Sequence, residues 1–174
     1  MNGKDTALFS KASDEWSTPQ WLFDMLDDEF QFHLDAAATC KNSKCGPCYC
    51  DKIGDALSLE LSWDYHSQGF PVWLNPPYSK IGAFMKKAYE ESLKGAVVVC
   101  LIPARTDTKY WHDYVMKAQE IRFVKGRLKF GDSKNSAPFP SVIVIFDPCY
   151  DHTHEFIRTG TPIIGKTIEQ PRKP

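Results

Sequence analysis

The segment Ala96 to Ile102, with the sequence AVVVCLI, constrains the fold of this 174-residue chain more than any other. It is a continuous apolar run rich in β-branched residues, bounded by Gly95 and Pro103. Such a run is typical of a strand buried on both faces. Strands of this kind lie in the centre of largely parallel sheets whose faces are covered by helices. The chain is therefore predicted to belong to the α/β class.

Helical and strand patterns alternate along the rest of the chain. From Gln20 to Glu29 the apolar residues recur at helical spacing, with Thr18 as the predicted N-cap and Pro19 at the first helical position. Two further apolar runs, Glu120–Phe130 and Ser141–Phe146, are predicted to pair antiparallel across a polar loop. A short buried strand that ends at Asp35 is predicted within residues 30–37, and a second strand is predicted at 71–74. Helices are predicted at 80–93 and 108–118.

Polar residues follow three of the predicted strands. They are Asp35, the turn Asn75–Tyr78, and the segment Pro103–Arg105. In open α/β sheets, ligands bind beyond the carboxyl ends of the strands. Because the fold would bring these three features to one edge of the sheet, we predict a site there.

The size and charge of the chain limit what kind of protein it is. Its length suits one compact domain, predicted at residues 14–150 between a flexible N-terminal tail (1–13) and a C-terminal tail (151–174). The formal net charge of −1 disfavours a module that binds nucleic acid through bulk charge, but it allows an enzyme with a local basic groove. No apolar run is long enough to span a membrane or act as a secretory leader, so we expect a cytoplasmic protein of unknown oligomeric state.

Four of the six cysteines gather between residues 40 and 50. Cys45 and Cys48 have the two-residue spacing of a zinc knuckle, but no second pair of this spacing follows. We favour reduced thiols in a loop and no metal, and a small zinc site stays open as the alternative.

The turn Asn75-Pro76-Pro77-Tyr78 directly follows a predicted strand and carries the most chemical information in the chain. An asparagine side-chain oxygen and a proline-fixed backbone carbonyl are both hydrogen-bond acceptors, and the prolines hold the turn rigid. The exocyclic amine of adenine is a poor nucleophile because its lone pair is delocalised into the ring. Two acceptors that bind its hydrogens would favour a pyramidal nitrogen. The ring of Tyr78 can stack on the base, worth about 1–3 kcal/mol. We therefore predict that the turn binds an adenine flipped out of a duplex. The alternative is a proline-rich turn that only ends the strand, with Tyr78 packed nearby.

Taken together, the chain resembles the phage-type DNA N6-adenine methyltransferases, the Dam-like phage group. The turn alone is shared by many amino-methyltransferases, whereas the ordered set of similar segments is more specific. The segments are Asp14–Pro19, Leu34–Ala38, Asp55–Leu57, Trp73–Ser79, Leu101–Thr108 and Gly126–Phe130.

The resemblance implies a fold, a cofactor and a set of residue roles. The fold is a Rossmann-like class-I methyltransferase sheet, mostly parallel with an antiparallel C-terminal strand, in a single domain without a separate target-recognition domain. The cofactor is S-adenosylmethionine and the partner is double-stranded DNA. The implied catalytic residues are Asn75, Pro76, Pro77 and Tyr78, and the implied cofactor-binding residues are Thr18, Pro19, Asp35, Ala36, Ala37, Asp55 and Asn75. Where many relatives of this fold carry a glycine-rich loop, this chain has Ala36-Ala37-Ala38.

Without a recognition domain, DNA contacts must come from loops and strands. One candidate cluster is Arg105 with Lys109. The other contains Lys125, Arg127, Lys129 and Lys134, of which the first three alternate onto one face of the predicted strand and suit a phosphate track. A solvated strand face is the alternative for this second cluster.

Direct transfer of a methyl group from the cofactor to the adenine amine is the expected reaction, with no covalent enzyme intermediate and no metal. Two alternatives stay open at this point. One is a methyltransferase of the same fold that acts on RNA or on protein glutamine. The other is a non-catalytic zinc-binding nucleic-acid module built around residues 40–50. A phage or prophage origin would fit the resemblance and would place the protein in the host cytoplasm.

Overall fold

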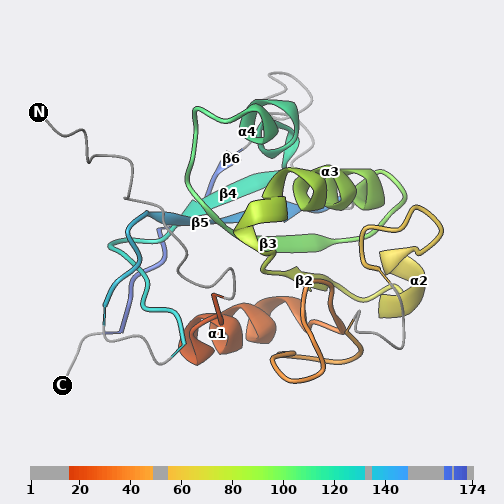
Figure 1. The fold of residues 1–174 in the computed structure, drawn as a ribbon, viewed down its shortest axis with the longest axis horizontal. Coiled ribbons are helices and arrows are strands. Elements are labelled where there is room, and N and C mark those ends of the chain that lie inside the picture. Colours follow the sequence, from red (N-terminus) through yellow and green to blue (C-terminus); the bar gives the residue numbers. More distant parts are fainter. Residues whose placement is uncertain (1–15, 49–54, 132–134, 149–162, 166, 172–174) are drawn as a thin grey trace, which may run out of the picture.

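A six-stranded sheet forms the centre of the protein (Figure 1), in the strand order β1-β2-β3-β5-β4-β6. The computed structural model describes residues 16–48, 55–131, 135–148, 163–165 and 167–171. The first three strands in this order run parallel, β5 is antiparallel to both β3 and β4, and β6 is parallel to β4. The strands are β1 (Leu34–Asp35), β2 (Val72–Leu74), β3 (Val98–Pro103), β4 (Glu120–Phe123), β5 (Ser141–Phe146) and β6 (Ile163–Ile164).

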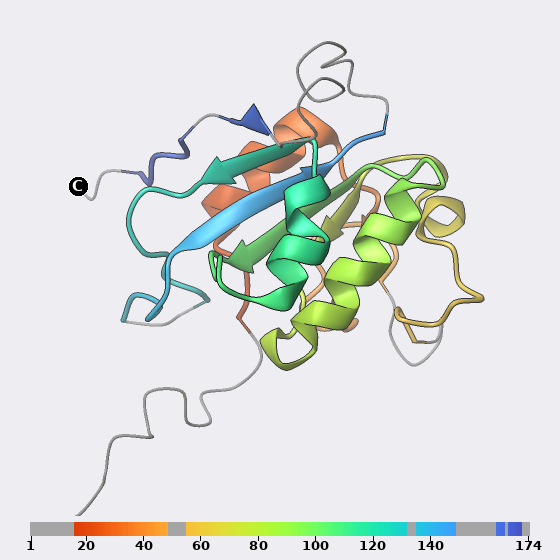
Figure 2. The ribbon, with the colours of Figure 1, turned by 90° about the horizontal axis from the view of Figure 1, so that it is seen from above.

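Helices cover the sheet on both faces. In Figures 1 and 2, α1 lies on one face, and α3 and α4 lie on the other. The α-helices are α1 (Gln20–Phe30), α2 (Trp63–Ser67), α3 (Ile81–Ser92) and α4 (Lys109–Asp113), and two short 3₁₀ turns occupy Tyr78–Lys80 and Val115–Lys117. The α/β class, the mixed sheet and the antiparallel pairing of β4 with β5 are thus confirmed.

Alternation along the strands divides the buried residues into two cores. Val99 and Leu101 of β3 pack with the α1 residues, whereas Val98, Cys100 and Ile102 pack with the α3 residues. All five of these β3 side chains are fully buried, as the sequence AVVVCLI predicts for a central strand. The α1 side of the sheet also holds Trp73, and the α3 side holds Trp63 of α2.

Several predicted boundaries are wrong. The N-cap of α1 is Pro19, not Thr18, and the cap makes no side-chain hydrogen bond. The strand expected within 30–37 is reduced to β1, and the strand expected at 120–130 ends at Phe123. The helix expected at 108–118 is split at Tyr114, whose φ of −129° is not helical. The helix α2 was not predicted.

Part of the predicted C-terminal tail joins the sheet. The strand β6 pairs with β4, and Ile168 is buried and forms a bridge with Val124. Residues 163–165 and 167–171 therefore contact the domain that we predicted to end at residue 150.

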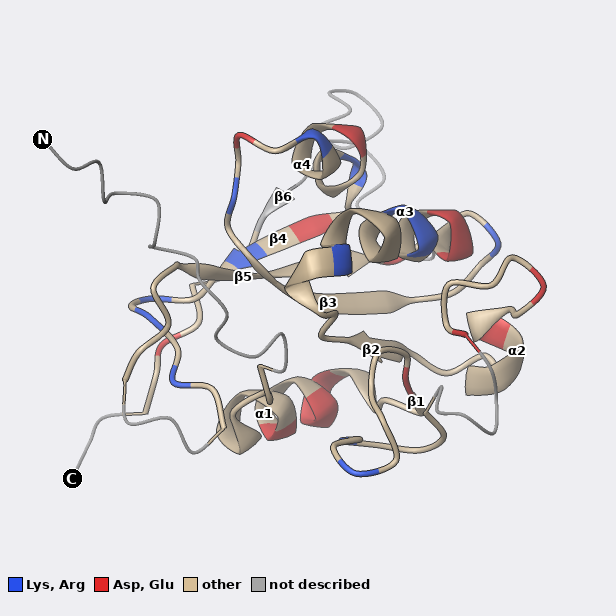
Figure 3. Cartoon of the chain, viewed as in Figure 1, with Lys and Arg blue, Asp and Glu red and all other residues tan. Residues whose placement is uncertain are grey.

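A buried ion pair fixes α3 to the segment that precedes α2. The Lys87 ammonium lies 2.9 Å from the Glu91 carboxylate and donates hydrogen bonds to the carbonyls of Ser58 and Leu61. Glu91 also accepts from the Trp63 amide at 2.8 Å. Figure 3 shows that residues of both charges are distributed along the helices, strands and loops. In the described part of the chain, no helix is long and apolar enough to cross a bilayer.

Candidate active site

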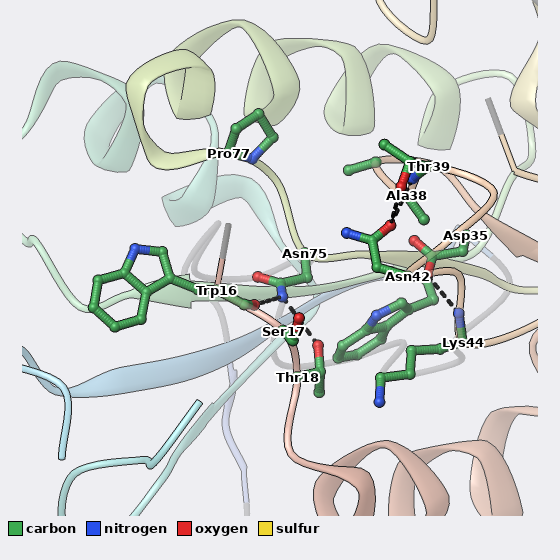
Figure 4. Close-up of a pocket in the computed structure, with 12 residues that line it drawn as sticks. Trp16, Ser17, Thr18, Asp35, Ala38, Thr39, Asn42, Lys44, Asn75 and Pro77 are labelled. Atoms are coloured by element: carbon green, nitrogen blue, oxygen red, sulfur yellow. Dashed lines mark hydrogen bonds between the residues drawn. The ribbon is translucent and has the colours of Figure 1, made fainter. Parts of the chain in front are cut away.

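A cavity of about 190 Å³ lies beyond the carboxyl ends of β1 and β2 (Figure 4). This is the sheet edge at which the sequence predicts a site. The lining residues come from the segment before α1, the loop after β1, and the end of β2. They are Trp16, Ser17, Thr18, Asp35, Ala37, Ala38, Thr39, Asn42, Lys44, Trp73, Asn75 and Pro77.

The side-chain amide of Asn75 has a fixed orientation. Its Nδ2 donates to the backbone carbonyl of Trp16 at 2.5 Å and to the hydroxyl of Thr18 at 3.0 Å (Figure 4). Because an amide nitrogen has two hydrogens, these two bonds use both of them. The oxygen Oδ1 is buried and has no hydrogen-bond partner among the described residues. The site therefore presents an oriented acceptor that needs a donor.

Aromatic side chains enclose Tyr78, the last residue of the same turn. Its ring stacks on Trp16, with 6.1 Å between the ring centroids and 17° between the planes, and Phe139 meets it edge-on at 5.2 Å. The Tyr78 hydroxyl is also buried without a partner in the described part. Burial, aided by Tyr110, raises the pKa of Tyr78 far above its usual value, although the positive charge of Arg105 opposes the shift. Tyr78 is therefore a neutral donor, and Trp16 covers one of its faces.

Asp35 is a buried carboxyl at the carboxyl end of β1. It accepts hydrogen bonds from the backbone amides of Lys44 and Ala37, and the Lys44 bond measures 3.0 Å. Burial raises the pKa of Asp35 to about 6, because desolvation outweighs these bonds and the charge of Lys44. A cationic ligand in the cavity would favour the ionised form of this carboxyl.

The loop 39–48 folds back onto β1 and completes the cavity. The amide of Asp35 donates to the carbonyl of Pro47 at 3.1 Å. Gly46 has a φ of +31°, and a Cβ there would lie 1.9 Å from the His33 carbonyl oxygen, so only glycine fits this close approach. Within the loop, the Asn42 side-chain oxygen accepts from the amide and hydroxyl of Thr39. These contacts place Asn42 and Lys44 in the cavity lining.

The structure brings together only some of the residues expected at the catalytic and cofactor sites. Thr18, Asp35, Ala37, Asn75 and Pro77 line the cavity. Other expected residues do not: Pro19 begins α1, Ala36 and Pro76 are buried beside the cavity, and Tyr78 lies behind Trp16. Asp55 is exposed and is not part of the lining, and its carboxylate accepts from the amide of Leu57 at 2.9 Å.

The predicted DNA-binding residues lie in two places. Arg105 is exposed in the turn after β3, and its charge acts on Tyr78. Lys109 begins α4 and pairs with Asp113.

In the second cluster, the expected strand face is wrong because β4 ends before Lys125. Lys125 pairs with Glu169 at 3.0 Å, and Arg127 donates to the Pro138 carbonyl at 2.7 Å. Lys129 is partly buried. Lys134 lies outside the described residues.

In the described part of the cysteine cluster, the sulfurs of Cys40 and Cys48 lie 4.0 Å apart. Burial raises the pKa of Cys45 to about 12, with further contributions from Asp35, Asp27 and Cys48. Among the described residues, no three His, Cys, Asp or Glu side chains lie where they could hold a metal. Cys50 lies outside the described part of the chain.

Sequence reasoning missed several lining residues: Trp16, Ser17, Thr39, Asn42, Lys44 and Trp73. Trp16 and Trp73 belong to segments that carry the resemblance, but no role was assigned to either. For Lys44 the available signal was weak, since it was a single lysine among cysteines in a loop.

The chain is similar to known proteins of one family. The family described as DNA N-6-adenine-methyltransferase (Dam) matches residues 5–161. A DNA N-6-adenine-methyltransferase of Escherichia phage T1 is 32% identical over 126 residues, 72% of this chain and 50% of that protein. One of Haemophilus phage HP1 is 30% identical over 150 residues, 80% of this chain and 83% of that protein. The chain thus spans about half the length of the T1 relative and most of the HP1 relative, and it belongs to the DNA N-6-adenine-methyltransferase (Dam) family.

Proposed function

We propose that this protein transfers a methyl group from S-adenosylmethionine to the exocyclic N6 amine of adenine in double-stranded DNA. Membership of the Dam family supports this reaction. The observation that carries it is the Asn75 amide, whose oxygen is buried, oriented and without a partner among the described residues. An adenine amine supplies the hydrogen-bond donor that this oxygen lacks.

The fold that we propose for this function is the Rossmann-like class-I methyltransferase fold. The parallel strands β1, β2 and β3, followed by the antiparallel β5, support this assignment. So does the position of the cavity beyond the carboxyl ends of β1 and β2.

The cavity suits the cofactor. It is hollow where β1 ends, its lining carries both a carboxyl and an ammonium group, and small side chains at Ala37 and Ala38 allow close approach. Thr18 and Asp35 are the residues that we propose to hold the amino-acid and ribose portions, with Pro19, Ala36 and Asp55 as more distant members of the site. When bound, S-adenosylmethionine supplies a methyl group on a sulfonium centre.

Asn75 and Pro76 hold the target amine in this proposal. The Asn75 side-chain oxygen and the Pro76 backbone carbonyl accept its two hydrogens and favour a pyramidal nitrogen. Because the prolines and Thr18 fix both acceptors beforehand, little reorganisation remains at the moment of transfer. Pro77 holds the turn in place and contributes to the cavity wall.

Stacking of the flipped base on Tyr78 requires Trp16 to move. In the structure the Trp16 ring packs against Tyr78, Phe130 and Phe139, and the Trp16 carbonyl accepts from Asn75. The adenine would stack on Tyr78 in place of Trp16 and would donate a hydrogen bond to the buried Asn75 oxygen. These two interactions offset part of the free-energy cost of unstacking the base from the duplex.

We assign contacts with DNA phosphates to basic residues outside the cavity lining. Arg105 is the best placed of these, because it is exposed and its charge acts on Tyr78. Lys109, Arg127 and Lys129 are further candidates. Like the phage proteins to which it is similar, the chain would act on DNA in the cytoplasm of a bacterial host.

The direct test is transfer of a labelled methyl group from S-adenosylmethionine to unmethylated duplex DNA, followed by nucleoside analysis. We expect the label in N6-methyladenine. Asn75→Ala should lower turnover by at least about 100-fold, because an oriented transition-state hydrogen bond is lost, while calorimetry shows S-adenosylhomocysteine binding largely unchanged. Label in RNA or protein glutamine instead of DNA would overturn the substrate assignment, and near-normal turnover by Asn75→Ala would overturn the role of the turn.

A further inference from the structure

The lining of the cavity contains one acidic and one basic side chain. Among the twelve residues that line it, Asp35 is the single acidic and Lys44 the single basic residue. The positive charge of Lys44 acts on Asp35, but no ion pair joins the two side chains in the described structure. Two opposite charges are therefore held in one cavity without neutralising each other.

Hydrogen bonds fix the position of Lys44. Its backbone amide donates to Asp35 at 3.0 Å, and its ammonium donates to the side-chain oxygen of Gln20 at 2.8 Å. Gln20 in turn donates to Asp24 at 2.6 Å. Because Gln20 is the first residue of α1, the ammonium lies beside the Thr18–Pro19 segment, where the helix dipole is also positive.

The arrangement complements a zwitterion. An α-amino acid carries an ammonium and a carboxylate on the same carbon, so it can meet a carboxyl on one wall and an ammonium on the other. Asp35 is buried and gains from a cationic partner. The Lys44 ammonium has two hydrogens beyond the one given to Gln20, and these suit a carboxylate.

We infer that Lys44 binds the carboxylate at the amino-acid end of S-adenosylmethionine while Asp35 binds its ammonium. The inference rests on the proposed cofactor and adds a binding residue to it. Lys44 thereby selects ligands that keep the complete amino-acid end.

Calorimetry with two ligands tests this role without any turnover. S-adenosylhomocysteine carries the amino-acid end, whereas methylthioadenosine lacks it and keeps the nucleoside. Lys44→Met should weaken S-adenosylhomocysteine binding by about 10- to 100-fold, as expected for loss of a charge-assisted hydrogen bond, and leave methylthioadenosine binding unchanged. Lys41→Met, an exposed lysine of the same loop, is the matched control and should bind both ligands as the wild type does.

The outcomes separate this inference from the proposed function. If Lys44→Met weakens both ligands equally, or neither, Lys44 does not bind the carboxylate, although the cofactor assignment stands. If the wild-type protein binds neither ligand, the proposed function fails and the inference fails with it.

Discussion

Thr18 acts on Asn75 and not on the helix that follows it. Its hydroxyl accepts from the Asn75 amide at 3.0 Å, and the side chain is buried. Without this acceptor, one amide hydrogen would lack its partner and the Asn75 side chain could rotate. The requirement for an oriented acceptor at residue 75 explains why a Thr-Pro segment accompanies the Asn-Pro-Pro-Tyr turn in this chain.

Replacing Thr18 by valine tests this orientation. The variant Thr18→Val keeps the shape of the side chain and removes the acceptor, so we expect kcat to fall by about 10-fold or more. Thr18→Ser keeps the hydroxyl and should retain most of the activity. The measurement is single-turnover methylation of DNA at saturating cofactor. Equal losses in the two variants would mean that the hydroxyl does not orient Asn75.

In the proposed site, Asp35 would make cofactor binding depend on pH. In the free protein, burial raises the pKa of this carboxyl to about 6, so below that pH it is mostly protonated. A bound ammonium favours the ionised form and lowers the pKa in the complex. Affinity for S-adenosylhomocysteine should therefore rise from pH 5 to about pH 7 and then level off, whereas Asp35→Asn should bind weakly with little pH dependence. A flat wild-type profile over that range would contradict the contact.

At the scale of elements, the buried strands were the easiest to predict. The sequence of β3 is continuous and β-branched, and β5 is similar, so both were found nearly to the residue. The α1 helix follows from its apolar spacing. Each of these elements carries its own local signal, because one complete face or both faces are buried.

Elements whose limits depend on their neighbours were predicted poorly. The strand β1 pairs over two residues because its partner β2 is itself short and is followed directly by Asn75-Pro76. The strand pattern beyond β4 is interrupted at Gly126, where φ is +77°. The missed helix α2 has five residues, and its capping residue Ser62 accepts from the Tyr65 amide. Strands limited by their pairing partners and helices of one or two turns are too short to give a detectable period of apolar residues in the sequence.

The presence or absence of a local sequence signal also explains which site residues could be predicted and which could not. Asn75 and Asp35 follow apolar runs that were predicted as strands and could be predicted to converge, whereas Thr18 was assigned to the site only through the resemblance. Lys44 reaches the cavity only because Gly46 and the Pro47 carbonyl fold its loop back onto β1. Such contacts between distant segments are not visible in the spacing of residues along the chain.

Displacement of the segment that contains Trp16 should be observable. We expect Trp16 fluorescence, taken as the difference between wild type and Trp16→Phe, to change when adenine-containing duplex DNA is added with S-adenosylhomocysteine. The physical reason is that the base takes the place of the indole against Tyr78. A duplex of G·C pairs alone is the control and should leave the difference spectrum unchanged. Identical responses to both duplexes would show that Trp16 stays in place.

At the scale of the whole molecule, the ion pair of Lys87 and Glu91 links α3 to the segment before α2. Burial alone would raise the pKa of Glu91, but hydrogen bonds from Lys94, Lys87 and the Trp63 amide outweigh it and lower the pKa. The ionised carboxylate is thus favoured in the fold. Its contribution to stability is present above the ordinary carboxyl pKa and is lost as the pH falls through the lowered value.

Removing the lysine should destabilise the protein. Lys87→Met leaves a buried carboxylate with fewer partners, so we expect the free energy of unfolding to fall by about 2–3 kcal/mol. The control is Lys86→Met, which breaks an exposed pair with Glu90 on the same helix and should change it by less than about 0.5 kcal/mol. Urea denaturation followed by circular dichroism measures both. Similar values for the two variants would show that the buried pair contributes no more than the exposed one.

The hydrophobic clusters on the two faces of the sheet form an α1 unit and an α3 unit, and strand β3 contributes side chains to both. Trp16 and Tyr78 belong to the α1 unit, whereas Leu34, the strand neighbour of Asp35, belongs to the α3 unit. A ligand that contacts Thr18 and Asp35 together spans both units. Such a ligand would stabilise both units, so we expect amide hydrogens in α1 and in α3 to slow their exchange together on binding.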